Sequence, residues 1–151
     1  MNGGSERQTM AIETYRGVVY PWQMDHMNHM NVQFYTARFD EATWHFFAAL
    51  GMDTDYFKVN RRGMAALEQR TLYRKELHGG ALIRISSELL EMKPKTIRFL
   101  HRMYEIGSGE EVATSELVGA HIDTDARKAV PFPEDIVKRQ AGFIDARATS
   151  A

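Results

Sequence analysis

One segment of helical periodicity, residues 31–50, constrains the fold of this chain more than any other part of its sequence. Its apolar side chains recur at steps of three and four, and they are Val32, Tyr35, Phe39, Ala42, Phe46, Ala49 and Leu50. Further large apolar residues stand on the opposite side, namely Phe34, Trp44 and Phe47. A helix that is apolar around much of its circumference should be largely wrapped by other structure. We therefore expect a buried central helix that ends at Gly51.

Segments typical of β-strands flank this helix in the sequence. Residues before the helix are rich in β-branched and aromatic types, and the segments after it change to a strand-like period. Five strands are predicted, over residues 12–20, 64–77, 81–92, 96–106 and 112–122. The last four form a meander with one face to bury, and the helix is the one large apolar object available to bury it. The sequence thus predicts an α+β fold in which a sheet curls around one long helix.

The rest of the chain divides into a connector, a second helix and two ends. Residues 52–62 are expected to be a connector, and a short helix is expected from about Glu134. A chain of 151 residues has the size of a single domain with one core. We expect residues 1–10 to be a disordered tail, residues 11–142 to form one domain, and residues 143–151 to be a frayed C-terminal tail.

The charge balance and the lack of cysteine exclude several classes of function. Lys and Arg number 19 against 20 Asp and Glu, so no excess of positive charge indicates binding to nucleic acid or an anionic membrane. Without cysteine there is no disulfide, thiolate nucleophile or cysteine zinc site. The sequence shows neither the apolar run of a signal peptide nor a segment long enough to span a bilayer. We therefore expect a cytoplasmic protein.

A dense group of polar side chains, in the segment Asp25-His-Met-Asn-His-Met-Asn31, stands between the first strand and the helix. Asn31 is well placed to cap the helix, whose N-terminus offers unpaired N–H groups and the positive end of the macrodipole. A carboxylate near that end can act as a nucleophile or as the base that activates water, while the helix start holds a developing oxyanion. The cluster therefore favours acyl transfer or ester hydrolysis, with Asp25 as the reacting group.

Two other interpretations of this cluster stay open at this point. Asp, Asn and His before a helix often serve only turn and capping chemistry, and Asn28 is suited to a left-handed conformation. Asp25, His26 and His29 also carry metal-ligand atoms, as in a metal-dependent hydrolase. The remaining histidines lack ligand spacing and are expected to be surface or satisfied core residues, and they are His45, His78, His101 and His121.

The segment 24–31 resembles the motif of hotdog-fold acyl-CoA thioesterases of the 4-hydroxybenzoyl-CoA thioesterase-like family. That motif is an aspartate, three residues, a histidine, one residue and an asparagine, which Asp25, His29 and Asn31 match. The order of elements over residues 12–122 is similar as well. The resemblance implies a five-stranded antiparallel sheet wrapped around the central helix. It also implies hydrolysis of acyl-CoA without a cofactor, at sites between the subunits of a homodimer or a dimer of dimers.

The resemblance further implies roles for individual residues. Asp25 is the nucleophile or general base, and the backbone donor that polarises the thioester carbonyl falls near Val32. His29 and Asn31 orient the carboxylate or the substrate. Basic surface residues meet the phosphates of CoA in such enzymes, and the candidates are Arg61, Arg62, Lys93 and Lys95.

The chain departs from the family pattern around the carboxylate. Trp22-Gln-Met-Asp25 stands where many relatives have Gly-Asp-Met-Asp, while Asn28 replaces a usual Gly and Val32 a usual Asn. These differences keep the carboxylate but change its surroundings, and we expect the bulky Trp22 to narrow the acyl pocket. A module that binds acyl-CoA without hydrolysing it is the alternative function.

Overall fold

The computed structural model describes residues 10–144. In chain order, the elements are β1 (Ile12–Val18), the short 3₁₀ helix η1 (Pro21–Gln23), α1 (Val32–Ala49), α2 (Thr54–Asn60), β2 (Arg62–Tyr73), β3 (Leu82–Met92), β4 (Thr96–Glu105), β5 (Glu111–Asp123), β6 (Lys128–Ala129) and α3 (Glu134–Ile144). The long helix, the five predicted strands and the C-terminal helix are all present.

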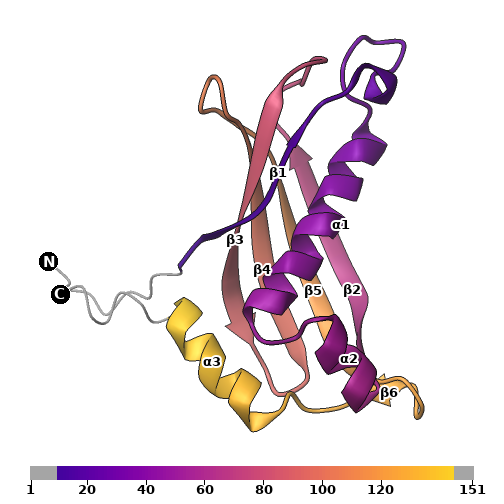
Figure 1. Cartoon of the computed structure of the whole chain (residues 1–151), viewed down its shortest axis with the longest axis vertical. Helices are drawn as coiled ribbons and strands as arrows, with labels where there is room; N and C mark the ends of the chain where they lie inside the picture. Colours follow the sequence, from indigo (N-terminus) through magenta and orange to yellow (C-terminus); the bar gives the residue numbers. More distant parts are fainter. Residues whose placement is uncertain (1–9, 145–151) are drawn as a thin grey trace, which may run out of the picture.

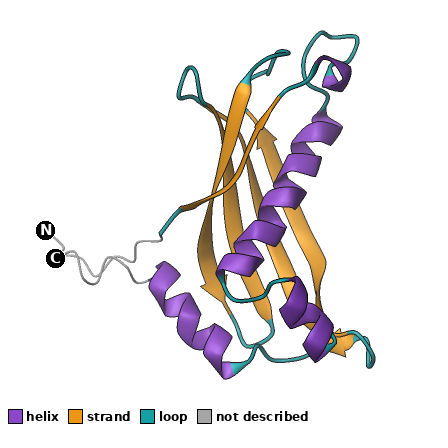
Figure 2. Ribbon diagram, viewed as in Figure 1, coloured by secondary structure: helices purple, strands orange, loops and turns teal. Residues whose placement is uncertain are grey.

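The long strands form one antiparallel sheet in the order β1-β3-β4-β5-β2, and the short β6 pairs with β5. The sheet is curled, and α1 lies along one of its faces (Figure 1). Figure 2 shows that the loops at the upper end of the sheet include the connection between β1 and α1. This arrangement confirms the predicted α+β architecture of a sheet around one long helix.

The main core lies between α1 and the face of the sheet that it covers. Side chains spaced by three and four residues along α1, including Tyr35, Phe39 and Phe46, are buried. Phe46 stacks on Phe99 of β4, with 5.3 Å between the ring centroids. Burial of a large apolar side chain contributes about 1.5–3 kcal/mol. These contacts therefore hold the helix against the sheet.

The cover over α1 is less complete than the sequence predicts. The side of the helix that carries Gln33, Asp40 and Trp44 is exposed, and Trp44 keeps 49% of its surface. A single sheet reaches one side of a helix. The ring of Trp44 meets Phe47 of the same helix edge on at 5.8 Å and Phe57 of α2 edge on at 6.1 Å. The expectation that other structure wraps most of the helix is wrong for this side of a single chain.

The expected connector over 52–62 contains the helix α2. Asp53 caps it, since its carboxylate accepts a hydrogen bond from the Tyr56 N–H at 2.9 Å. Arg61 ends it in the left-handed conformation, with a φ of 54°. The seven-residue helix is too short to show a clear apolar period, which explains why the sequence pattern did not reveal it.

The strand predicted over 64–77 is shifted in the structure. β2 begins at Arg62 and ends at Tyr73. The following residues leave the sheet and run beneath the loop before α1, where the Met30 N–H donates to the Leu77 carbonyl at 2.8 Å. This departure from the sheet brings residues 74–77 to the polar cluster.

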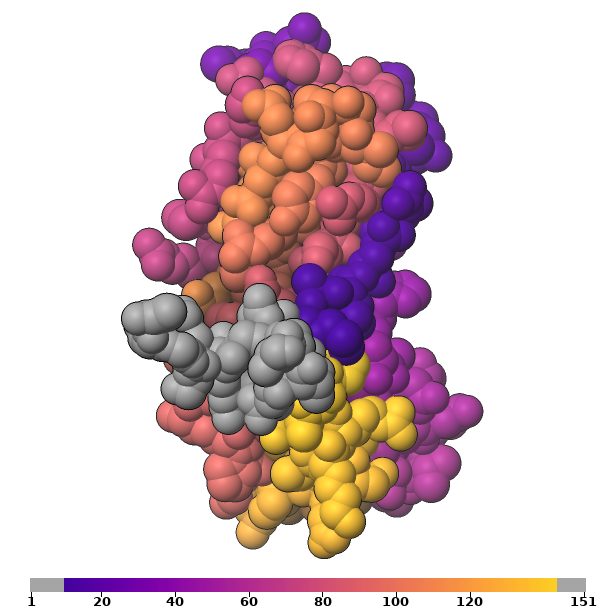
Figure 3. All heavy atoms as spheres, turned by 90° about the vertical axis from the view of Figure 1, so that its left-hand side faces the viewer, coloured from indigo at the N-terminus to yellow at the C-terminus, as the bar shows by residue number. Residues whose placement is uncertain are grey.

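The C-terminal helix continues past residue 142, to Ile144. Phe143 of α3 is buried in the core, and its carbonyl accepts a hydrogen bond from the Met10 N–H at 2.8 Å. Figure 3 shows α3 in yellow, below the first strand in indigo. Residues 1–9 and 145–151 of the two expected tails lie outside the described residues. Within residues 10–144, no helix has the length and apolar character needed to cross a membrane.

A row of buried polar side chains crosses the core. Ser87 Oγ lies 2.7 Å from Thr14 Oγ1 and 2.6 Å from His101 Nδ1. On the other side of the ring, His101 Nε2 lies 2.8 Å from Thr43 Oγ1 of α1. Burial lowers the pKa of His101 to about 3, so its imidazole is neutral at physiological pH. His101 is thus the satisfied core residue that the sequence predicted, and it ties α1 to β3 and β4.

Candidate active site

The segment from Asp25 to Asn31 is a tight loop closed by its own backbone. The Asn28 N–H donates to the Asp25 carbonyl at 2.8 Å, and the Asp25 N–H donates to the His29 carbonyl at 3.0 Å. Asn28 has a φ of 67°, the left-handed conformation expected for it. The turn interpretation is therefore correct for the backbone, and it leaves the side chains of the loop to be assigned.

The carboxylate of Asp25 is held by one donor on each oxygen. Its Oδ1 accepts from the Met27 N–H at 2.9 Å, and its Oδ2 accepts from the side-chain amide of Asn31 at 2.9 Å. These bonds, the one from Asn31 first, lower the pKa of Asp25. The group is half-buried and ionised at neutral pH, and each oxygen keeps further lone pairs for a substrate or a water molecule.

The same asparagine starts the helix. Asn31 Oδ1 accepts from the Gln33 N–H at 3.0 Å, which is the predicted N-cap. The Val32 N–H donates to no acceptor among residues 10–144. Because Asn31 binds both Asp25 and the first turn of α1, it fixes the carboxylate beside the positive end of the helix.

Asp25 lines a cavity of about 340 Å³ at the end of the sheet. Its walls come from the loop, the start of α1 and the segment after β2, and they include Asp25, His29, Val32, Tyr35, Tyr73, Arg74, Lys75 and Glu76. The structure thus brings together Asp25, His29 and Val32, and joins Asn31 to them by a hydrogen bond. The sequence did not single out residues 73–76, because a strand was expected to continue to residue 77.

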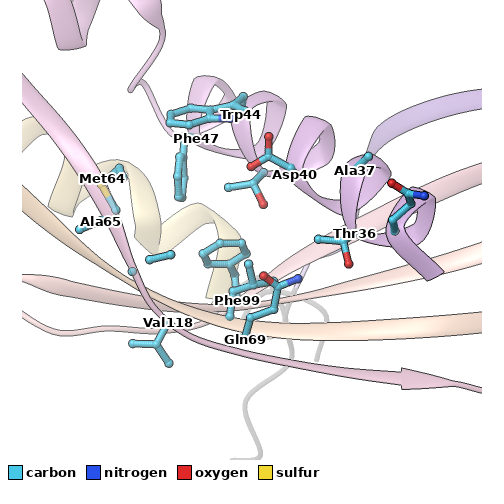
Figure 4. Close-up of a pocket in the computed structure, with 15 residues that line it drawn as sticks. Thr36, Ala37, Asp40, Trp44, Phe47, Met64, Ala65, Gln69, Phe99 and Val118 are labelled. Atoms are coloured by element: carbon cyan, nitrogen blue, oxygen red, sulfur yellow. The ribbon is translucent and has the colours of Figure 1, made fainter.

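A second cavity of about 410 Å³ lies between the exposed side of α1 and the strands β2 and β5. In Figure 4, Trp44, Phe47 and Phe99 form much of its wall, and Asp40 and Gln69 contribute polar atoms. It shares no lining residue with the cavity of Asp25. The cavity at the carboxylate is therefore lined by several charged side chains, whereas Asp40 is the one charged residue that lines the separate cavity along the helix.

Residues 19–140 match the family model of the thioesterase-like superfamily. The matched region holds the Asp25 loop, the central helix and all the long strands after it. The chain belongs to the thioesterase-like superfamily. This result confirms the family resemblance and the expected class of enzyme, a thioester hydrolase.

Individual relatives of this thioesterase-like chain agree with that assignment. A betainyl-CoA thioesterase from Pseudomonas aeruginosa is 26% identical over 138 residues, which cover 91% of this chain and 87% of that protein. An L-carnitine dehydrogenase/betainyl-CoA thioesterase from Ruegeria pomeroyi is 32% identical over 135 residues, which cover 85% of this chain and 27% of that protein. The chain thus spans about a quarter of the second, longer relative.

Solved structures confirm the predicted hotdog fold of this thioesterase-like chain. A hypothetical protein from Staphylococcus aureus, solved in complex with CoA, superposes with a TM-score of 0.80 at 20% sequence identity. The superposition covers 93% of this chain and 86% of the other. The sheet and its central helix are therefore shared between two sequences that have diverged widely.

His29 lies among different residues from those that the metal interpretation proposed. Its Nε2 lies 3.2 Å from Glu76 Oε2, and its ring meets that of His78 edge on at 5.2 Å. The potential ligand atoms of His29, Glu76 and His78 all lie within 4.8 Å of one another, the one such group among the described residues. Asp25 and His26 are not part of it, so the structure gives no support to the ligand set Asp25, His26 and His29.

The four basic candidates for CoA binding do not meet Asp25 within one chain. Arg62 begins β2, whereas Tyr73 at the Asp25 cavity ends it, and a strand of this length spans about 36 Å. Arg61 forms an ion pair with Asp125 at 2.7 Å. Lys93 and Lys95 stand in the turn between β3 and β4, at the same end of the sheet as Arg62.

Trp22 does not line the cavity of Asp25. It keeps 71% of its surface exposed and stacks on Tyr20, with ring centroids 4.5 Å apart and planes within 5° of parallel. Within one chain, the expected narrowing of the acyl pocket by Trp22 is therefore wrong.

Proposed function

We propose that the chain hydrolyses acyl-CoA thioesters at the cavity of Asp25. One observation carries the proposal: an ionised carboxylate, held by the Asn31 amide, lines an open cavity next to the N-terminus of the central helix. Family membership supports the hydrolysis of a thioester. The structural relative in complex with CoA supports the choice of thiol.

In this reaction the thioester carbonyl lies between Asp25 and the start of α1. Asp25 either attacks the carbonyl carbon, forming an anhydride that water then opens, or removes a proton from the water that attacks it. The carbonyl oxygen gains negative charge and is stabilised by the Val32 N–H and the helix dipole. The C–S bond breaks and CoA leaves as a thiolate, which needs no strong acid.

We further propose a dimer through the open edge of β2. β2 pairs with β5 on one side and has no strand on the other among the described residues. Leu67 on this strand is 57% exposed, and Leu72 and Tyr73 are exposed as well. A long apolar edge is a template for another strand. Two such dimers could stack into the dimer of dimers that the sequence left open.

A dimer of this kind would give the distant basic residues a role. If two copies of β2 pair in antiparallel fashion about their midpoints, residue 62 of one copy lies opposite residue 73 of the other. Arg61 and Arg62 of the second copy would then stand beside the first copy's Asp25 cavity, where the phosphates of CoA could meet them. Lys93 and Lys95 remain candidates for the same role. Arg74 and Lys75, which already line the cavity, are the candidates within one chain.

The names of the relatives suggest the first substrate to assay. Two proteins that cover most of this chain are named for betainyl-CoA hydrolysis. We therefore place betainyl-CoA in a panel with acetyl-CoA, a medium-chain acyl-CoA and an aromatic acyl-CoA, and measure thiol release for each.

Asp25→Asn tests the mechanism because it preserves the shape of the side chain and removes its charge. We expect thiol release from the best substrate to fall about 10³-fold or more, as for loss of a nucleophile or base. Asp55→Asn, on the exposed start of α2, is the matched control and should keep wild-type activity. A mutant Asp25→Asn protein with wild-type activity would rule out this mechanism.

Two alternatives give different results in the same assay. A non-catalytic module would bind acyl-CoA tightly and release no thiol from any member of the panel. A metal-dependent hydrolase using His29, Glu76 and His78 would lose its activity with a chelator and regain it with zinc. For the Asp25 mechanism we expect the same rate before and after chelation.

A further inference from the structure

The cavity of Asp25 has an aromatic corner whose chemistry the hydrolysis itself does not use. Tyr73, the last residue of β2, keeps 49% of its surface exposed. Its ring stands at 88° to that of Tyr35, with 5.2 Å between the centroids. Tyr35 is buried and its hydroxyl donates to the Lys75 carbonyl at 3.1 Å, so the ring that supports Tyr73 is fixed in place. Tyr73 therefore offers a firmly backed aromatic surface to the cavity.

Two of the charged side chains that line the same cavity are carboxylates. Asp25 is ionised, and Glu76 stands on the wall formed by the segment after β2 with its side chain 62% exposed. Burial, and then the neighbouring Tyr73 and Glu76, raise the pKa of Tyr35 to about 12. That direction is the one expected beside negative groups.

The two cations at the cavity wall are already paired with carboxylates near the start of β5. Arg74 Nε lies 3.1 Å from Glu111 Oε2, and Lys75 Nζ lies 2.8 Å from Glu110 Oε1. Glu76 Oε2 lies 3.2 Å from His29 Nε2. Arg74 and Lys75 therefore offset the charge of Glu76 only in part.

An aromatic face beside carboxylates is the environment that favours a cation without N–H groups. Such a cation cannot donate strong hydrogen bonds, and it gains its binding energy from the ring quadrupole and from nearby negative charge. A neutral acyl chain of the same shape would gain only contact with the rings. Tyr73 and Glu76 line the cavity of Asp25 itself, whereas the cavity along α1 shares no lining residue with it. An acyl group held beside Asp25 is therefore within reach of Tyr73 and Glu76.

We propose that Tyr73 and Glu76 form a subsite for a quaternary ammonium group, so that the preferred substrates are short acyl-CoAs carrying a fixed positive charge near the thioester. Tyr73 contacts the methyl groups of the cation and Glu76 supplies the opposite charge. These two side chains are specificity-determining residues, while Asp25 performs the chemistry. The inference rests on the proposed thioesterase function and deepens it by naming the class of acyl group.

The test compares two substrates that differ only in charge. Betainyl-CoA carries a trimethylammonium group, and 3,3-dimethylbutyryl-CoA replaces its nitrogen by carbon with nearly the same volume. We expect the wild-type protein to hydrolyse betainyl-CoA with a kcat/KM about tenfold or more above that of the neutral isostere. Isothermal titration of both compounds into the Asp25→Asn protein measures the same preference as a ratio of Kd values, without turnover.

Variants at the subsite should change this ratio. We expect Tyr73→Leu and Glu76→Gln each to lower the ratio of kcat/KM for betainyl-CoA to that for the neutral isostere about five- to tenfold. Tyr73→Phe keeps the ring and should keep the preference. Glu134→Gln, on the exposed start of α3, is the matched control for the loss of one carboxylate.

The possible results separate the two proposals. Equal use and equal binding of the two compounds by the wild-type protein would overturn the subsite, even if both were hydrolysed rapidly. Hydrolysis of neither compound, together with tighter binding of betainyl-CoA, would keep the subsite and reject the proposed hydrolysis of these substrates. A preference that disappears with a chelator would assign Glu76 to a metal with His29 and His78, and would also overturn the subsite.

Discussion

The buried row around His101 and the loop of Asp25 are both hydrogen-bonded polar clusters that contact the central helix, yet they have opposite chemistry. The hydroxyls of Thr43 and Ser87 are hydrogen-bonded to the two ring nitrogens of His101, and burial keeps the ring neutral. Asp25 is half-buried, its two donors favour the charged form, and it lines an open cavity. A buried polar group whose atoms all have hydrogen-bond partners stabilises the fold. A polar group that is hydrogen-bonded on one side and faces a cavity on the other can react with a substrate in that cavity.

The largest expected effect is on activity, at Asp25. We expect Asp25→Asn to lower kcat/KM about 10³-fold, which corresponds to about 4 kcal/mol, and to change the free energy of unfolding by less than about 1 kcal/mol. Urea unfolding followed by circular dichroism, beside the thiol-release assay, measures both quantities. A large loss of stability with little loss of activity would show that Asp25 has a structural role like that of His101, and would contradict the contrast between the two clusters.

At His101 we expect the opposite result, a loss of stability with little loss of activity. Replacing it by leucine leaves the buried hydroxyls of Thr43 and Ser87 without their ring partner. We expect His101→Leu to cost about 2 kcal/mol of unfolding free energy, because each hydroxyl loses one buried hydrogen bond and keeps only its other partner, the Phe39 carbonyl for Thr43 and Thr14 for Ser87. The folded fraction should keep its kcat within a few fold. Urea unfolding measures the first quantity, and rates corrected for the folded fraction measure the second.

Stability should also depend on pH through His101. The pKa of this ring is about 3 when folded, against 6.5 for an ordinary histidine. Between these values the unfolded chain binds more protons, so stability falls as the pH drops from about 6.5, by at most about 1.4 kcal/mol per pH unit.

Asp25 contributes in a lower pH window. Its folded pKa is lowered from 3.8, so its contribution is present above that value and is lost as the pH falls through the folded pKa. Urea midpoints between pH 4 and 7 therefore separate the effect of His101 from that of Asp25, but they include a contribution of the same sign from His121, whose pKa burial also lowers. A variant His101→Gln should show a flatter profile over this range. An unchanged slope in His101→Gln would assign the effect to other groups.

The smallest effect is expected at Asn31, which has both a structural and a functional role. Asn31 caps α1 and also donates to Asp25. In Asn31→Ser the hydroxyl can still cap the helix but cannot reach the carboxylate as the amide does, so we expect about tenfold lower kcat and less than about 0.5 kcal/mol of lost stability. Asn31→Ala should lose the cap as well, at about 1 kcal/mol. If both variants keep wild-type kcat, Asn31 serves the helix alone.

Local patterns predicted much of the fold because they depend on near neighbours in the chain. The spacing of Phe39 and Phe46 predicted the central helix, and Gly51 predicted its end, with a φ of 100° in the structure. The short helix α2 was missed because two turns carry little periodicity, and its cap at Asp53 was the signal that could have revealed it.

The candidate site was predicted in part. The order Asp25, His29 and Asn31 identified the loop, and the structure brings these residues to one cavity or joins them by hydrogen bonds. Tyr73 and Glu76 could not be found in this way. They stand more than forty residues later in the chain. Tyr73 lies at the end of β2, and Glu76 reaches the loop because the chain leaves the sheet after β2.

The sequence by itself determined the central helix, its capped start and the carboxylate beside that start, because a few neighbouring residues suffice for each. Only the tertiary structure decided what else surrounds the carboxylate and how far the basic residues lie from it. The physical reason is that the path of the chain between distant segments depends on strand pairing and on burial across the whole sheet. Local propensity cannot encode these contacts, and in this protein they set the charge and the shape of the cavity.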